Sequence, residues 1–203
     1  MDLKLIIFAK NLIVGKVKTR IANKIGAIKA LDVYKILLSN TLNIVDSLPG
    51  RIHPVVYLSE SSEEELITSN FKYEIKVQKG RNIGERMANA FENEFSSGVT
   101  RVCLIGTDIY DLNKQIILSS FEDLSKKKVV IGPAMDGGYY LIGMNQYYPD
   151  VFRGIAWGQP TVLHKTITYF ESIGIDYHLL PILNDVDEFE DIPEEILKKL
   201  NFR

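Results

Sequence analysis

Short apolar runs alternate with longer stretches in which apolar residues recur every three or four positions. Continuous apolar runs are typical of strands buried on both faces of a sheet, and the three-to-four spacing is typical of amphipathic helices. The predicted strands cover residues 3–9, 53–59, 73–78, 101–106, 128–132, 139–144 and 176–182. The predicted helices cover residues 25–48, 83–95, 113–124, 160–173 and 191–200, with a short helix beginning near Ser61 at a capping box.

This alternation predicts an α/β fold, a three-layer α/β/α sandwich around a mostly parallel sheet. The run 101–106 is the most hydrophobic and is expected at the centre of the sheet. In VVIGPAMDGGYYLIGM, residues 129–144, Asp-Gly-Gly between two apolar runs predicts a hairpin, so the sheet is expected to be mixed. No linker-like stretch interrupts the pattern, and residues 1–203 are expected to form a single domain.

Composition excludes several classes of protein. With 203 residues, 46% hydrophobic residues and a net charge of −2, the chain is not of the disordered kind and lacks the basic field of nucleic-acid-binding proteins. No apolar run approaches the ~18 residues that span a bilayer, and the N-terminus does not resemble a targeting segment. We therefore expect a cytoplasmic protein without a membrane span. Cys103 lies in a buried run and is expected in the core, and the oligomeric state stays open.

Basic residues collect directly after the first predicted strand. This stretch contains neither a Walker A spacing nor a G-x-G-x-x-G fingerprint. Gly15 nevertheless leaves the backbone open to a ligand, and Lys18 with Arg20 can clamp phosphate oxygens. A solvated surface with scattered cations is the alternative. The cations of this stretch are Lys10, Lys16, Lys18, Arg20 and Lys24.

Carboxylates follow three later strands. Asp108 comes directly after 101–106, Asp136 lies in the predicted hairpin, and Asp185 with Asp187 follows the last strand. In open α/β sheets, ligands bind at the carboxyl ends of the strands, and Mg²⁺ and Mn²⁺ prefer carboxylate and phosphate oxygens. Asp108, Asp187 and Asp185 are therefore candidate metal ligands. Each has an alternative interpretation. Asp108 could cap the following helix, Asp136 could lie in a plain turn, and Asp185 with Asp187 could belong to a solvated acidic loop.

Two further residues are candidates for ligand contacts. Arg81 lies in a basic turn, GRNIGER, at the end of the strand 73–78 and could meet a nucleotide. Trp157 is the only tryptophan of the chain, and it is expected either to anchor the core or to stack on a base or sugar.

Five motifs in order resemble one family across nearly the whole chain. They are FAK-x4-G-x-VKTRIA, GERM, LIGTD, GPAMDGGYYLIG and DVD. The chain thereby resembles the bacterial glycosyltransferase-A-like family of the nucleotide-diphospho-sugar transferase superfamily. It is also similar to small nucleotidyltransferases such as the phospholactate guanylyltransferases and the molybdenum-cofactor cytidylyltransferases.

The resemblance implies a GT-A-like sandwich that binds a nucleotide with a divalent metal ion, Mg²⁺ or Mn²⁺. It places Gly15, Lys18 and Arg20 on the nucleotide-binding loop and Asp108 on the metal-binding aspartate. Asp187 or Asp185 would supply the second carboxylate at the metal. The turn Asp136-Gly137-Gly138 would face the acceptor or the sugar.

The hypothesis that follows is a metal-dependent transferase that uses a nucleotide-activated donor and a small-molecule acceptor. The leading donor class is a nucleoside-diphosphate sugar. Asp108 would hold the metal, and Asp136 would orient the acceptor or act as its base. One alternative is a nucleotidyltransferase that condenses a nucleoside triphosphate with a phosphorylated acceptor. Another is a non-catalytic nucleotide-binding protein, because G-T-D offers a single carboxylate.

Overall fold

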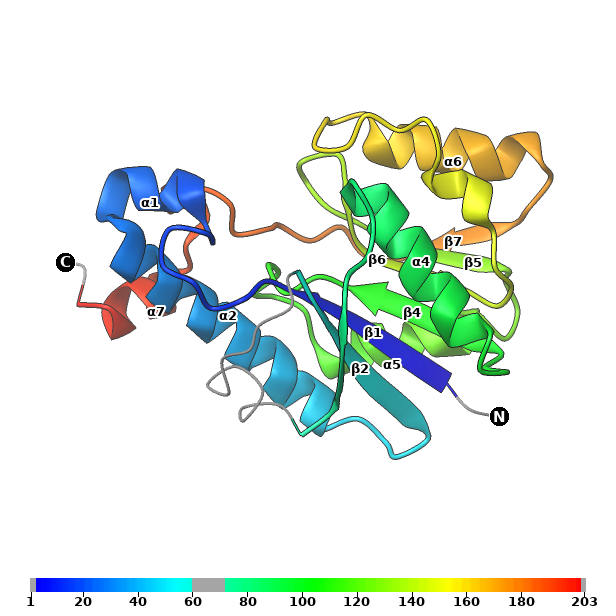
Figure 1. Cartoon of the computed structure of the whole chain (residues 1–203), viewed down its shortest axis with the longest axis horizontal. Helices are drawn as coiled ribbons and strands as arrows, with labels where there is room; N and C mark the ends of the chain where they lie inside the picture. The colour runs from blue at the N-terminus through cyan, green and yellow to red at the C-terminus, as the bar shows by residue number, and fades with distance from the viewer. Residues whose placement is uncertain (1–2, 60–71, 202–203) are drawn as a thin grey trace.

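A computed structural model describes residues 3–59 and 72–201 of the chain (Figure 1). The described residues form a seven-stranded mixed sheet in the order β3-β2-β1-β4-β6-β5-β7. The strands are β1 (Leu3–Ala9), β2 (Ile52–Leu58), β3 (Glu74–Val77), β4 (Arg101–Ile105), β5 (Val129–Pro133), β6 (Tyr139–Met144) and β7 (Tyr177–Leu179). The helices are α1 (Thr19–Ile25), α2 (Ala27–Asp46), α4 (Ile83–Phe95), α5 (Lys114–Asp123), α6 (Val162–Ser172) and α7 (Glu194–Lys199), with 3₁₀ turns at Pro149–Phe152 and Phe189–Asp191.

The sheet is mostly parallel, as predicted, and β4 is its central strand. Among the strands in the described part of the chain, β6 alone runs antiparallel to its neighbours, β4 and β5. The β5–β6 connection is the predicted hairpin. The carboxyl ends of the parallel strands therefore meet at one edge, together with the beginning of β6.

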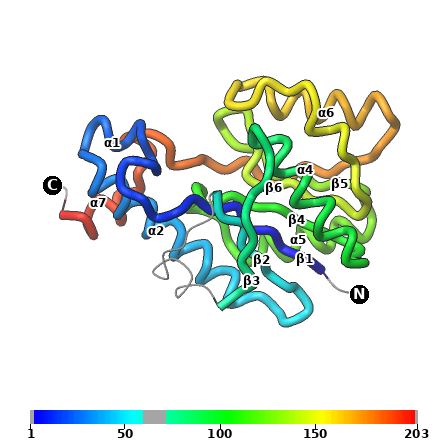
Figure 2. Tube along the Cα trace, viewed as in Figure 1, coloured from blue at the N-terminus to red at the C-terminus, as the bar shows by residue number. Residues whose placement is uncertain are grey.

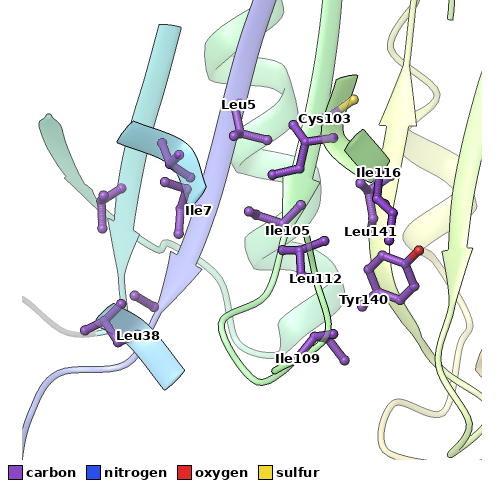
Figure 3. Close-up of a cluster of buried hydrophobic side chains, with 14 of the residues drawn as sticks. Leu5, Ile7, Leu38, Cys103, Ile105, Ile109, Leu112, Ile116, Tyr140 and Leu141 are labelled. Carbon is purple, nitrogen blue, oxygen red and sulfur yellow. The ribbon is translucent and has the colours of Figure 1, made fainter. Parts of the chain in front are cut away.

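Helices cover both faces of the sheet, which confirms the three-layer sandwich. Successive residues of β1 alternate between two cores, because side chains of a strand point to opposite faces. Leu5 and Ile7 pack in the core that Tyr34 of α2 also enters, part of which Figure 3 shows. Ile6 and Phe8 pack in the core on the α4 face. Cys103 belongs to the first core, where burial raises the pKa of its thiol to about 12.

The predicted helix 25–48 is two helices in the structure. Gly26 adopts φ 86°, a conformation open to glycine, and separates α1 from α2. The sequence prediction gave no helix before Ile25, and this was wrong, because α1 begins at Thr19. Ile21 of α1 is buried in a third core together with residues of α2 and α7.

Other boundaries differ near prolines. The strand predicted at 176–182 is shorter and ends at Leu179, two residues before Pro181. The helix predicted from Pro160 begins at Val162. The C-terminal helix begins at Glu194, after a separate 3₁₀ turn at Phe189–Asp191. The helix predicted near Ser61 lies outside the described residues.

The segment that joins β7 to α7 crosses the carboxyl edge of the sheet. In Figure 2 this orange segment runs from the side of β7 and β5 toward α1 and α7. It pairs with the residues that follow β4, through an antiparallel bridge between Ile109 and Asp185. Two segments that are far apart in the sequence are thereby brought together. No helix among residues 3–59 and 72–201 is long and apolar enough to cross a membrane.

Tyr34 of α2 links the chain after β1 to the chain after β4. Its buried hydroxyl accepts a hydrogen bond from the backbone N–H of Lys10 (2.7 Å) and lies 3.2 Å from Oγ1 of Thr107. Burial, and then the charge of Asp108, raises the pKa of this phenol. The neutral hydroxyl therefore ties together the two loops that leave neighbouring strands.

We predict that Tyr34→Phe lowers the free energy of unfolding by about 1–3 kcal/mol, because it leaves buried polar groups without a partner. Urea unfolding followed by circular dichroism measures this. Tyr177→Phe is the matched control, since the Tyr177 hydroxyl makes an exposed hydrogen bond to Glu171. Equal stability of Tyr34→Phe and the control would contradict the role of this hydroxyl.

Candidate active site

The sheet has a topological switch point between β1 and β4. Strand order reverses at β1, which pairs with β2 on one side and with β4 on the other. Loops that leave the two strands diverge at such a point, and a crevice opens between them. The basic stretch after β1 and Asp108 after β4 both lie there.

Lys18 is the centre of this crevice. Its ammonium nitrogen lies 2.5 Å from Oδ1 of Asp108 and 3.1 Å from Oδ1 of Asp187, and its side chain is only 3% exposed. The backbone of Lys18 is left-handed (φ 47°), which is uncommon outside glycine, and α1 begins directly after it. The guanidinium of Arg20 lies 3.7 Å from Oδ2 of Asp187. Two cations of the basic stretch thus meet two of the predicted carboxylates.

Backbone pairing holds the two carboxylates in place. The N–H of Val186 donates to the carbonyl oxygen of Asp108 at 2.9 Å, next to the Ile109–Asp185 bridge. Beyond it, the carboxylate of Asp191 accepts hydrogen bonds from the N–H groups of Asp187 and Glu188. This part of the acidic run therefore has a structural role that orients the chain at Asp187.

The Asp136 turn is both a hairpin turn and a wall of the site. Oδ1 of Asp136 accepts a hydrogen bond from the N–H of Gly138 at 2.7 Å. Gly137 has φ 86°, and a Cβ there would lie 2.2 Å from the carbonyl oxygen of Pro160. The two glycines therefore close the turn against the chain before α6 and leave the Asp136 carboxylate exposed.

A cavity of about 280 Å³ opens beside the Lys18 cluster. One side of it is acidic and contains Asp108, Asp136, Asp185 and Asp187. The other side is apolar and contains Ile83, Met87, Tyr139, Trp157 and Val162. The indole of Trp157 meets the ring of Tyr139 edge-on, with 6.4 Å between the centroids.

The acidic side carries a charge imbalance. Partial burial, followed by the nearby charges of Asp136 and Asp187, raises the pKa of Asp185 to about 6. The charge of Lys18 opposes this rise. A cation or a hydrogen-bond donor placed among these carboxylates would relieve their repulsion.

The carboxylates suit a divalent metal ion only in part. Oδ1 of Asp108 is buried, and its contact with the Lys18 ammonium at 2.5 Å is an ion pair without hydrogen-bond geometry. Within the ranges that the structure describes, no group of three or more His, Cys, Asp or Glu side chains could hold a metal ion. A Mg²⁺ or Mn²⁺ ion at Asp108 and Asp187 would need its other oxygen ligands from substrate phosphates and water.

The structure brings most of the predicted site residues together. Those that line the cavity or contact its carboxylates are Lys18, Arg20, Asp108, Asp136, Gly138, Trp157, Asp185 and Asp187. Lys10, Gly15, Gly137 and Arg81 do not line it. The side chain of Arg81 is 89% exposed and forms an ion pair with Glu85 at 2.7 Å. Gly15 is exposed at φ 78° in the loop before Lys18, and Lys10 is held through its backbone by Tyr34.

The apolar side was missed at the sequence level. Ile83 and Met87 lie in the predicted helix 83–95 and Tyr139 in the predicted strand 139–144, and none of them carries a chemical signal in the sequence. Helical periodicity does not distinguish a side chain that faces a core from one that faces a cavity. Ile83 is 39% exposed in the structure, and the sequence does not reveal this exposure.

Gly84 of α4 makes room for the Trp157 indole. A Cβ at residue 84 would lie 2.3 Å from Nε1 of Trp157, too close for any real contact. We predict that Gly84→Ala displaces the indole, shifts its fluorescence emission to the red and costs about 1–3 kcal/mol of stability. Gly50→Ala is the control, because a Cβ there meets nothing within 4 Å. An unchanged emission spectrum in Gly84→Ala would contradict this packing.

Comparison with solved structures shows the same fold in transferases. A protein from Desulfovibrio desulfuricans G20, provisionally assigned as a nucleotide-diphospho-sugar transferase, superposes with a TM-score of 0.87 at 31% identity, over 93% of this chain and 84% of that one. The inositol-1-phosphate CTP transferase from T. maritima superposes with a TM-score of 0.57 at 12% identity, over 98% and 95% of the chains. Rv0371C from Mycobacterium tuberculosis H37Rv, in complex with manganese, gives 0.57 at 10% identity, over 98% and 99%.

These likenesses confirm the predicted GT-A-like fold of the nucleotide-diphospho-sugar transferase superfamily. No curated protein matches the chain. The profile of one family matches residues 49–159, which is more than half of the 203 residues. The chain therefore belongs to the family described as "Uncharacterized protein conserved in bacteria (DUF2064)".

Proposed function

We propose that this chain is a metal-dependent transferase, a single domain over residues 1–203, that uses a nucleoside-diphosphate sugar as donor and transfers the sugar to a small acceptor. The observation that carries the proposal is the Lys18 ammonium held between Asp108 and Asp187 at the sheet's switch point. Cations from one loop and carboxylates from two others converge there beside a cavity. A diphosphate and a divalent metal ion have the complementary charges.

The cations of the basic stretch would bind the diphosphate. The ammonium of Lys18 can donate three hydrogen bonds. It would therefore stay paired when phosphate oxygens replace its carboxylate partners. Arg20 lies at the same end of the crevice with a side chain that is 66% exposed, so it can turn toward a second phosphate. Lys10, Gly15 and Arg81 sit outside the cavity, and we keep them as candidate contacts of the nucleoside part.

The carboxylates would hold the metal ion and the acceptor. Asp108 and Asp187, with Asp185 beside them, would bind Mg²⁺ or Mn²⁺ together with the diphosphate. A bound divalent ion would neutralise charge that develops on the leaving diphosphate. Support for this cofactor comes from the donor set and from the manganese complex of Rv0371C, a protein of the same fold.

Asp136 would act on the acceptor. Its carboxylate is exposed at the cavity wall and is oriented by the N–H of Gly138. In the reaction, the acceptor hydroxyl oxygen forms a bond to the sugar's anomeric carbon as the bond from that carbon to the phosphate oxygen breaks. The acceptor proton passes to Asp136, and the nucleoside diphosphate leaves with the bonding electron pair.

Nucleotidyl transfer is the second candidate function, and the likeness to the inositol-1-phosphate CTP transferase favours it. In that reaction, a phosphate oxygen of the acceptor would attack the α-phosphate of a nucleoside triphosphate and release pyrophosphate. Sugar transfer instead releases a nucleoside diphosphate. The released product therefore separates the two reactions.

We predict that a nucleoside diphosphate or its sugar conjugate raises the melting temperature of the protein in the presence of Mn²⁺ and less in its absence. At a ligand concentration roughly one hundred times Kd, the stabilisation is about 2.7 kcal/mol. Asp108→Asn removes the metal-dependent part, because an amide is a weaker ligand for a hard cation. A thermal-shift screen over the bases measures both effects.

Asp32→Asn is the matched control, because Asp32 lies on α2 in a surface ion pair with Lys35. It leaves the metal-dependent shift unchanged. If Asp108→Asn keeps the full shift, the assignment of Asp108 is wrong. If nucleotides bind equally with and without Mn²⁺ and no donor is turned over, the chain is a non-catalytic nucleotide-binding protein.

A further inference from the structure

The charged side chains that line the cavity all carry the same sign of charge. Every charged side chain that lines it is an aspartate, and none of the described lining residues is Lys, Arg or His. The two cations that touch the acidic side, Lys18 and Arg20, are already paired with Asp108 and Asp187. Asp136 and Asp185 line the same cavity, and among the described residues neither has an ion pair with a Lys or Arg.

A phosphorylated acceptor has no cationic side chain as a partner in such a cavity, and a metal ion at Asp108 and Asp187 would already be engaged by the donor's diphosphate. Proteins bind phosphate groups with guanidinium and ammonium groups or with convergent backbone N–H donors. A phosphate here would meet carboxylates on one side and apolar carbon on the other. Both surroundings disfavour an anion, the first by charge repulsion and the second by desolvation.

The apolar side of the cavity suits a ligand that presents a flat apolar face. Trp157 and Tyr139 form an edge-on pair, and Ile83 and Met87 extend the same wall from the first turns of α4. Ile83 is 39% exposed, so apolar surface here is still open to a ligand. Burial of apolar surface against such a wall stabilises a ligand without requiring charge.

The nucleotide belongs elsewhere in the crevice. The cavity has no lining residue from β1, β2 or β3, or from the basic stretch at residues 10–24, so the cations that can bind a diphosphate lie at its border. Asp108 and Asp187 belong both to the cavity and to the Lys18 cluster. The reacting bond would therefore lie at these carboxylates, with the second substrate in the cavity.

From this geometry we propose that the acceptor is an uncharged molecule that presents hydroxyl groups to Asp136 and Asp185 and an apolar face to Trp157. The proposal rests on the proposed transferase function and narrows it to acceptors without phosphate. It also favours sugar transfer to a hydroxyl over nucleotidyl transfer to a phosphate.

The single tryptophan makes the test direct, because all indole fluorescence comes from the cavity wall. We titrate the protein at pH 8 with p-nitrophenyl glucoside and with p-nitrophenyl phosphate, which carry the same quenching group on a neutral and on an anionic partner. The expected result is saturable quenching by the glucoside, with a Kd for the phosphate that is at least roughly tenfold higher than the Kd for the glucoside. Asp136→Asn and Asp185→Asn each narrow this difference, since each removes one repelling charge.

Gly50→Ala serves as the control variant and keeps the wild-type difference between the two probes. Equal or tighter binding of the phosphate by the wild-type protein would overturn the proposal. Displacement of the glucoside by a nucleoside diphosphate would also overturn it, because the cavity would then be the base site. If the glucoside binds as expected while no nucleotide binds at all, the proposed transferase function fails and the assignment of an uncharged ligand to the cavity stands.

Discussion

The ion cluster of Lys18, Asp108 and Asp187 is the interaction on which the rest of the site depends. It joins three segments that are far apart in the chain, at the switch point between β1 and β4. A nearly buried ammonium is costly unless it is paired, so the two carboxylates must come to Lys18 when the protein folds. The fold therefore brings opposite charges together at the position where a metal ion and a diphosphate would later exchange with them.

Contacts between uncharged groups hold this charged cluster in place. The hydroxyl of Tyr34 ties the backbone after β1 to Thr107, directly before Asp108. The β-bridge at Ile109 and Asp185 aligns the C-terminal segment with the loop after β4. The site is thus built on the ends of central strands, and its position follows from the hydrophobic core beneath it. Rigid strand ends are a suitable support for groups that must keep their geometry during a reaction.

The sequence was sufficient to predict the sandwich, the mixed sheet and the hairpin at Asp136, because strand runs and turn residues carry strong local signals. Strand-end position also singled out Asp108, Asp185 and Asp187, and the structure places them together. It did not predict α1, whose few turns are set by burial of Ile21 against distant residues. The apolar cavity wall was also missed, because Ile83 and Tyr139 acquire their place only when α4 and the β5–β6 hairpin come together.

The most direct test of the account is a titration of Mn²⁺ followed by electron paramagnetic resonance, which measures free Mn²⁺, with and without a nucleoside diphosphate. Two carboxylates that share a lysine are a weak metal site by themselves, while two carboxylates with a diphosphate are a strong one. The account predicts weak binding of Mn²⁺ to the protein alone and at least roughly tenfold tighter binding to the complex than to protein or nucleotide separately. Equal affinity with and without the nucleotide would contradict it.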